Sequence, residues 1–148
     1  MLAVFEKDVE KVPQTFHYRA NYSRDSITLA DQEEALKEPS YAVLFASMVS
    51  GADIARCQEV ACKDSYHAPR NAYDFALYVK GADITKCQEI ACKHPRFAYL
   101  FALNIKGSNI KICQKAVKST EYELFFKRYV PGAKQPKAQR LTNRRKKR

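Results

Sequence analysis

The chain of 148 residues has no long apolar run and few of the motifs that mark enzymes. No stretch approaches the ~18 consecutive apolar residues of a membrane-spanning helix, so we expect no membrane span. Glycine-rich phosphate loops and H-E-x-x-H are missing, and no serine or cysteine stands with a histidine and an acid at motif spacing. Because the three histidines are also scattered, we expect a non-enzymatic protein that holds no metal or other cofactor.

Glycine is scarce as well, and three of the four glycines mark one turn of a tandem repeat. Gly51, Gly81 and Gly107 each stand inside the pattern A-x-x-F-A-x-x-(V/I)-x-G-x-(D/N)-I-x-x-C-Q. A unit this small cannot bury a core alone, so neighbouring units must stack. The full repeats span about residues 41–118.

Each unit predicts two short helices. In the first unit Ala42, Phe45, Ala46 and Val49 have the i, i+3, i+4, i+7 spacing of one helical stripe, which the two later units repeat. The repeat glycine suits the left-handed conformation that ends a helix. Asp53, or its equivalent two residues after each glycine, is a residue type that caps a helix start. The sequence therefore predicts an all-α fold of tandem αα-hairpins, a fragment of an α-solenoid.

Degraded units are expected on both sides, since the ends of a stack meet water. Residues 28–37 match the second half of an earlier unit, and residues 121–129 resemble a closing first helix. Residues 16–23 could form one more degraded first helix. Residues 1–12 predict a further helix or a packed arm. Four extra residues around 68–71 include Pro69 and favour a lengthened loop between the first two full units.

The positive charge is concentrated after the repeats. The formal net charge is +10, yet residues 1–126 hold 16 basic and 16 acidic residues. Residues 131–148 are poor in large apolar side chains, so we divide the chain into a repeat domain at 1–130 and an extended or disordered basic tail. The ten cations that follow without an acid are Lys127, Arg128, Lys134, Lys137, Arg140, Arg144, Arg145, Lys146, Lys147 and Arg148. Such a run predicts contact with nucleic-acid phosphates, DNA or RNA, or with an acidic protein.

Five cysteines, an odd number, all lie at helix positions. Cys57 and Cys62 are five residues apart, as are Cys87 and Cys92, so the members of each pair do not point the same way. Paired zinc ligands prefer gaps of two to four residues. We interpret the cysteines as small buried apolar residues with free thiols in a reducing cytoplasm. Across units, stacked cysteines could still approach one another.

The glutamine that follows each repeat cysteine has two interpretations. Gln58, Gln88 and Gln114 could form a ladder of amides bonded to the backbone of the next unit. They could instead form a row that reads one ligand group per unit, as in repeat proteins that read one base per repeat.

Aromatic residues and lysines alternate on the predicted first helices. Tyr73, Tyr78 and Tyr99 lie near Lys80 and Lys106, and aromatics interleaved with cations can stack bases or dock a partner. Tyrosine at a helix shoulder more often covers the edge of a core with its hydroxyl in water. We favour that second interpretation and keep the five residues as a candidate partner-binding set.

The repeat A-x-x-F-A-x-x-V-x-G-A-D-I-x-x-C-Q-E-x-A-C-K resembles short helical repeat proteins of unassigned function encoded by large DNA bacteriophages. The resemblance covers about residues 32–126, and its G-A-D-I-x-x-C-Q core is kept in two units. The third unit departs from it, with Ser108 and Asn109 in place of Ala and Asp. The resemblance implies a viral protein acting inside a host cell, and it carries no catalytic residues. By architecture alone the chain is also similar to Sel1- and HEAT-like α-solenoids.

Three functions remain open from the sequence. The first is nucleic-acid binding by the tail while the stack docks a protein, in the cytoplasm or in the nucleus of a eukaryotic host. It predicts that Arg70, Lys80, Lys106 and Lys111 align with the tail as one positive track. The second is a protein–protein adaptor or an inhibitor of a host complex, which predicts an apolar or tyrosine-rich patch on the concave face. The third is a virion component whose tail faces packaged nucleic acid.

Overall fold

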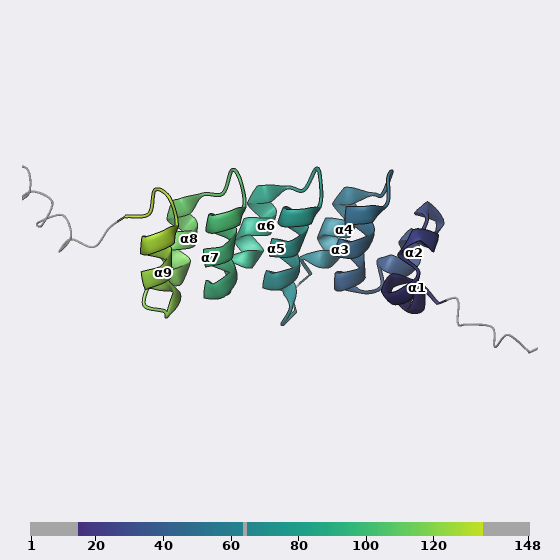
Figure 1. The fold of residues 1–148 in the computed structure, drawn as a ribbon, viewed down its shortest axis with the longest axis horizontal. Coiled ribbons are helices and arrows are strands. Elements are labelled where there is room, and N and C mark those ends of the chain that lie inside the picture. The colour runs from purple at the N-terminus through teal and green to yellow at the C-terminus, as the bar shows by residue number, and fades with distance from the viewer. Residues whose placement is uncertain (1–14, 64, 135–148) are drawn as a thin grey trace, which may run out of the picture.

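The computed structural model describes residues 15–63 and 65–134, and this part of the chain is helical throughout, as predicted. The predictions for residues 1–12 and for the end of the tail lie outside the described residues. Figure 1 shows an elongated stack with α1 and α2 at one end and α8 and α9 at the other. The elements are α1 (Phe16–Tyr22), η1 (Arg24–Ser26), η2 (Leu29–Asp31), α2 (Gln32–Ala35), α3 (Pro39–Met48), α4 (Ile54–Ala61), α5 (Ala68–Tyr78), α6 (Ile84–Ala91), α7 (Pro95–Asn104), α8 (Ile110–Val117) and α9 (Tyr122–Tyr129).

The full repeats form the hairpins α3–α4, α5–α6 and α7–α8. The first helices α3, α5, α7 and α9 pack side by side in a row, and each second helix also contacts the first helix of the following unit. Figure 1 shows these first helices as one layer of the stack and α4, α6 and α8 as the other. The predicted degraded units are confirmed, because α1, η2 with α2, and α9 stand where residues 16–23, 28–37 and 121–129 predicted them.

One phenylalanine per unit forms the centre of the core. The side chains of Phe45, Phe75, Phe101 and Phe126 have no exposed surface. Burying each contributes roughly 1.5–3 kcal/mol. The repeat alanine three residues before the first three of them is also fully buried and lets neighbouring helices approach closely.

The turn inside each hairpin has the predicted conformation. Its glycine has a φ of +82° at Gly51, +88° at Gly81 and +86° at Gly107, in the region that favours glycine. The side chain of Asp83 then caps α6 by accepting a hydrogen bond from the N–H of Lys86. Asp53 and Asn109 cap α4 and α8 in the same way.

A fourth copy of this turn follows α9 and was not predicted. Gly132 has a φ of +82°, and Val130 is buried like Val79 and Ile105, which precede the turn in the second and third units. The sequence V-P-G-A-K at 130–134 thus repeats V-K-G-A-D at 79–83. The boundary between domain and tail that we drew after residue 130 falls inside this turn.

The predicted loop at residues 68–71 is wrong, because these residues form the first turn of α5. Pro69 stands at the start of this helix, where its missing N–H costs nothing and its fixed φ is helical. The extra length lies earlier: residues 62–67 separate α4 from α5, whereas residues 92–94 separate α6 from α7.

Adjacent units are joined by a glutamine clamp, defined here as the two hydrogen bonds between one repeat glutamine and the backbone of the next helix-capping residue. The amide of Gln58 donates to the carbonyl oxygen of Asp83 at 3.0 Å, and its Oε1 accepts from the N–H of Asp83 at 2.9 Å. Gln88 binds both backbone groups of Asn109 at 2.8 and 2.9 Å.

Related hydrogen bonds occur at both ends of the described stack, where Gln114 makes both bonds to Lys134 at the position of a capping residue and Gln32 makes only one bond to Asp53. Gln114 binds the N–H and the carbonyl of Lys134, each at 3.1 Å, and Gln32 accepts from the N–H of Asp53 at 2.8 Å. The predicted amide ladder is therefore confirmed. The alternative of a ligand-reading row is wrong, because Gln58 and Gln88 are buried and their side-chain amides are hydrogen-bonded to the backbone of the next unit.

We predict that Gln88→Ala lowers the free energy of unfolding by about 1–3 kcal/mol, because it leaves the part-buried N–H of Asn109 without its partner and removes one of the two hydrogen bonds to the carbonyl of Asn109. Gln114→Ala is the matched control. Its clamp is exposed to water, so its loss should stay below about 1 kcal/mol. Urea denaturation followed by far-UV circular dichroism measures both losses, and equal losses would contradict a buried clamp.

Candidate nucleic-acid interface

The C-terminal end of the stack is positively charged before the tail begins. Residues 105–134 contain seven basic and two acidic residues, whereas residues 15–104 contain ten basic and eleven acidic residues. The change starts in α8, where Lys115 occupies the position that is Glu59 in α4 and Glu89 in α6. Lys111 and Lys115 are exposed and four residues apart, so they share one face of α8.

Several cations of the earlier units are paired with acids. Arg56 binds Glu33 at 2.8 Å, Lys37 binds Glu34 at 2.6 Å, and Arg19 binds Asp31. Looser pairs join Arg70 to Asp74 at 3.6 Å and Lys86 to Asp83 at 4.0 Å. These pairs, together with the small excess of acids at residues 15–104, reduce the positive charge that the earlier units offer to a polyanion.

The cations of the last full unit have no such partners. Among residues 15–63 and 65–134, Lys106, Lys111 and Lys115 form no ion pair. One of the two acids at this end, Glu123, is already engaged. A hydrogen bond from Lys127 and the N–H of Ser119 hold its pKa below the usual range. The positive charge here is therefore uncompensated by the part of the chain that the structure describes.

Three of the ten predicted phosphate-binding residues are described. Lys127 is half-buried and binds Glu123 at 2.5 Å, so it contributes less free charge than we predicted. Arg128 is exposed, with its guanidinium 5.4 Å from the ring centre of Tyr129. Lys134 is exposed and its backbone is held in the clamp of Gln114. The others lie outside the described residues: Lys137, Arg140, Arg144, Arg145, Lys146, Lys147 and Arg148.

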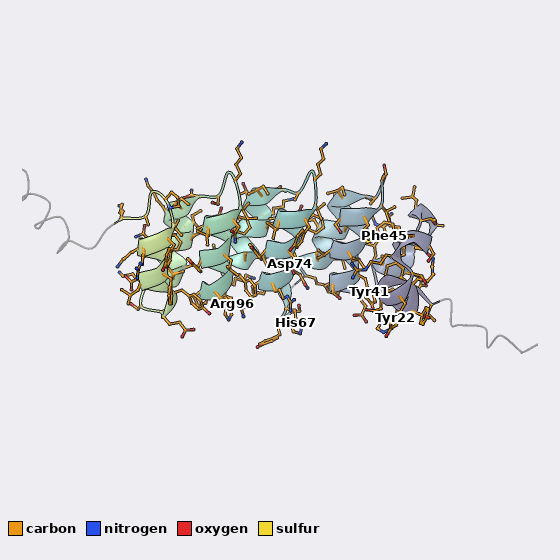
Figure 2. All side chains as sticks on the ribbon, in the orientation of Figure 1. Tyr22, Tyr41, Phe45, His67, Asp74 and Arg96 are labelled. Atoms are coloured by element: carbon orange, nitrogen blue, oxygen red, sulfur yellow. The ribbon has the colours of Figure 1, made fainter. Side chains whose placement is uncertain are left out.

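Three of the four residues of the predicted positive track lie on the same edge of the stack. Lys80 and Lys106 precede the turn glycines, and Lys111 lies in the first turn of α8, so these three lie toward the same edge of the stack. Arg70 lies at the start of α5, about 15 Å along the helix from Lys80, and belongs to the opposite edge. Figure 2 shows that opposite edge at His67 and Arg96, beside the starts of α5 and α7.

The predicted partner-binding tyrosines differ in exposure. Tyr73 is buried, and its hydroxyl accepts a hydrogen bond from the side chain of Asn104 at 2.9 Å, so it is a core residue and not a contact residue. Tyr99 is half-buried and stacks on Tyr122 with ring centres 6.1 Å apart. Tyr78 is 63% exposed and is the one tyrosine of the three that is free to contact a partner.

The layer of first helices also carries exposed apolar side chains. Besides Leu124 in α9, they are Met48 in α3, Leu77 and Tyr78 in α5, Leu103 in α7, and Phe125 and Tyr129 in α9. We name these six residues the first-helix patch. It has the apolar and tyrosine-rich composition that the adaptor function predicted.

A groove of about 810 Å³ opens between α3 and α5 in the same layer. Val43, Leu44 and Tyr78 line it together with Arg70 and Asp74. Asp74 occupies the position that is Leu44 in α3 and Leu100 in α7. This site was not predicted from the sequence. The signal for it was the acid Asp74 at a repeat position where the other two full units have leucine. Burial raises the pKa of Asp74, against the opposing effect of the Arg70 guanidinium.

The described part of the chain shows neither a membrane-spanning helix nor a cluster of metal ligands. Residues 15–63 and 65–134 contain no helix of the length and apolarity that a membrane span requires. The same residues bring together no group of three or more histidine, cysteine or acidic side chains able to hold a metal ion.

Comparisons with known proteins add no family. No protein-family model matches the chain, and neither a curated protein nor a solved structure is significantly similar to it. The function is therefore argued from the surface of the stack.

We predict that Asp74→Leu raises the free energy of unfolding by about 1 kcal/mol at neutral pH, because it removes a partly desolvated carboxylate. The pKa of Asp74 is higher in the fold than its ordinary 3.8, so the fold binds this proton more tightly than the unfolded chain does. Wild-type stability should therefore fall as pH rises from about 4 through the folded pKa, and the gain from leucine should grow over the same interval.

Thermal unfolding of both proteins across this pH range measures the effect. A gain that is constant from acid to neutral pH would contradict a contribution from the charged carboxylate.

Proposed function

We propose that the protein is a non-enzymatic helical-repeat binding protein whose C-terminal end contacts nucleic-acid phosphates. One observation carries the proposal: within residues 15–63 and 65–134, Lys106, Lys111 and Lys115 are exposed and form no ion pair, and residues 105–134 hold seven basic residues against two acidic ones. The chain adds the basic residues of its last segment directly after Lys134.

Binding of this kind is mainly to the phosphate backbone. Each lysine or arginine that neutralises a phosphate releases a condensed counterion, so affinity falls steeply with salt. Phosphate contacts position a protein on the nucleic acid but read no sequence directly. The protein should therefore bind with weak sequence preference. The resemblance to phage repeat proteins would place this activity in the cytoplasm of a host cell, or on packaged nucleic acid within a virion.

We predict that Lys111→Ala combined with Lys115→Ala weakens binding to duplex DNA and makes the slope of log affinity against log salt less negative by about 1.8, at about 0.9 per lost phosphate contact. Fluorescence anisotropy with labelled duplex DNA, and with single-stranded RNA, over a salt series measures this slope in the full-length chain.

The matched control is Lys37→Ala combined with Lys86→Ala. It removes the same two charges from cations that already have acidic partners. The control should leave the slope unchanged. If both double variants change the salt slope equally, only net charge matters. If neither variant changes the slope, α8 does not contact the nucleic acid.

Protein docking is the second candidate function, as an adaptor or as an inhibitor of a host complex. The first-helix patch and the adjoining groove favour it, because exposed apolar side chains beside a concave site are typical of interaction surfaces. The half-buried carboxylate of Asp74 supports it as well, since stability alone would favour leucine there.

Panning a displayed peptide library against the protein tests this second function. Selected peptides should lose binding to a Leu77→Ser, Tyr78→Ala variant and retain it with Lys111→Ala, Lys115→Ala. Peptides that bind both variants equally well would show that the docking site lies outside the first-helix patch.

A further inference from the structure

The clamp is accompanied by a second contact that recurs between units. Cys92 at the end of α6 lies with its Sγ 3.6 Å from the Sγ of Cys113 in α8. One unit earlier, Cys62 at the end of α4 occupies the equivalent position, and its thiol interacts with that of Cys87 in α6. Cysteines that stand five apart within a unit therefore pair across units, while Cys57 is left outside both pairs.

Each pair combines one accessible thiol with one buried thiol. Cys62 and Cys92 are half-buried, whereas Cys87 and Cys113 have no exposed surface. Cys62 also lines an open groove of about 870 Å³ between α4 and α6, which gives a small reagent a route to its sulfur. All five cysteines are free thiols in this structure.

The two thiols of each pair are also chemically unequal. The hydrogen bond between the two thiols lowers the pKa of Cys92, and the same bond together with burial raises the pKa of Cys113. Cys62 and Cys87 show the same asymmetry for the same reason. Because the thiolate is the nucleophile, the accessible member of each pair is the one that reacts first.

We propose that these pairs are two peroxide-reactive dithiol sites, at which the half-exposed thiols of Cys62 and Cys92 react and the buried thiols of Cys87 and Cys113 resolve them to disulfides between adjacent units. This inference is independent of the proposed nucleic-acid and docking functions, because none of the four cysteines belongs to either surface.

The reaction balances with hydrogen peroxide as the oxidant. The Cys92 thiolate attacks one peroxide oxygen, the O–O bond breaks, and the sulfur becomes a sulfenic acid while hydroxide leaves and takes a proton as water. The sulfur of Cys113 then attacks the sulfenic sulfur, the S–S bond forms, and the hydroxyl leaves as water with the thiol proton. Two thiols and one peroxide thus give one disulfide and two waters.

Oxidation would fasten the same junctions that the glutamine clamp holds. The amide of Gln88 lies 3.2 Å from the Sγ of Cys113 while it also binds the backbone of Asn109. A disulfide at Cys92 and Cys113 therefore joins the two second helices beside the clamp. The oxidised stack should resist separation of its units more strongly than the reduced stack.

Peptide mapping of the full-length chain after treatment with hydrogen peroxide and alkylation of the remaining thiols tests the proposal. We expect linked peptides for Cys62 with Cys87 and for Cys92 with Cys113, alkylated Cys57, and reversal by a thiol reductant. The two cross-links should raise Tm by on the order of 10 °C, because each closes a loop of the unfolded chain.

Two sets of variants keep the test specific. Cys57→Ala should retain both linkages and the rise in Tm. Cys62→Ala should lose one linkage and keep the other, and Cys62→Ala with Cys92→Ala should lose the rise in Tm. The position of Cys92 holds Lys118 in the last unit, so it accepts other side chains. Three results would each overturn the proposal: a disulfide that involves Cys57, disulfides only between two chains, or cysteine sulfinic and sulfonic acids without any disulfide.

Discussion

The stack depends on one side chain per junction. A repeat glutamine presents one donor and one acceptor to the N–H and carbonyl of a single capping residue in the next unit, as Gln58 does for Asp83. Both groups lie where a helix begins, and buried backbone groups must find partners. Because the amide can satisfy both groups only in one relative placement, the clamp fixes the spacing of neighbouring units. The turns and the thiol pairs are then held at repeated positions.

The repeated turn links this packing to function. Lys106 lies one residue before a turn glycine, and the clamp of Gln88 holds Asn109 on the other side of the same turn. A cation held on an ordered turn loses less entropy when it binds a phosphate than one on a free arm does. The last unit replaces the outward acid of the earlier units by Lys115, so the surface becomes positive without any change in the fold.

Much of the fold could be predicted from the sequence because its determinants are local. The spacing of Phe45 and its neighbours, the turn glycines and the capping Asp83 each act within a few residues. The turn at Gly132 was missed, because Pro131 and Lys134 replace the residues that identify the turn elsewhere. Pro69 was misread, since proline marks helix starts as well as loops.

The candidate site was less predictable, because its properties arise between units. The burial of Tyr73 depends on Asn104 of the next unit, and the free charge of Lys111 depends on which acids lie nearby in space. Arg70 and Lys80 are only ten residues apart in the sequence. They lie at opposite edges of the stack, because α5 runs between them. The pairing of Cys92 with Cys113 likewise follows from the stacking of units and not from spacing within one unit.

Hydrogen–deuterium exchange at the backbone amides of Asp83 and Asn109 tests the clamp most directly. An N–H at a capping position has no partner within its own helix, and without the clamp it would exchange like a loop amide. With the clamp, both amides should exchange only as fast as the stack opens, close to the slowest amides of α6 and α8, and Gln88→Ala should release Asn109 while Asp83 stays protected. Fast exchange at both amides in the wild-type chain would contradict a stack held together by its glutamines.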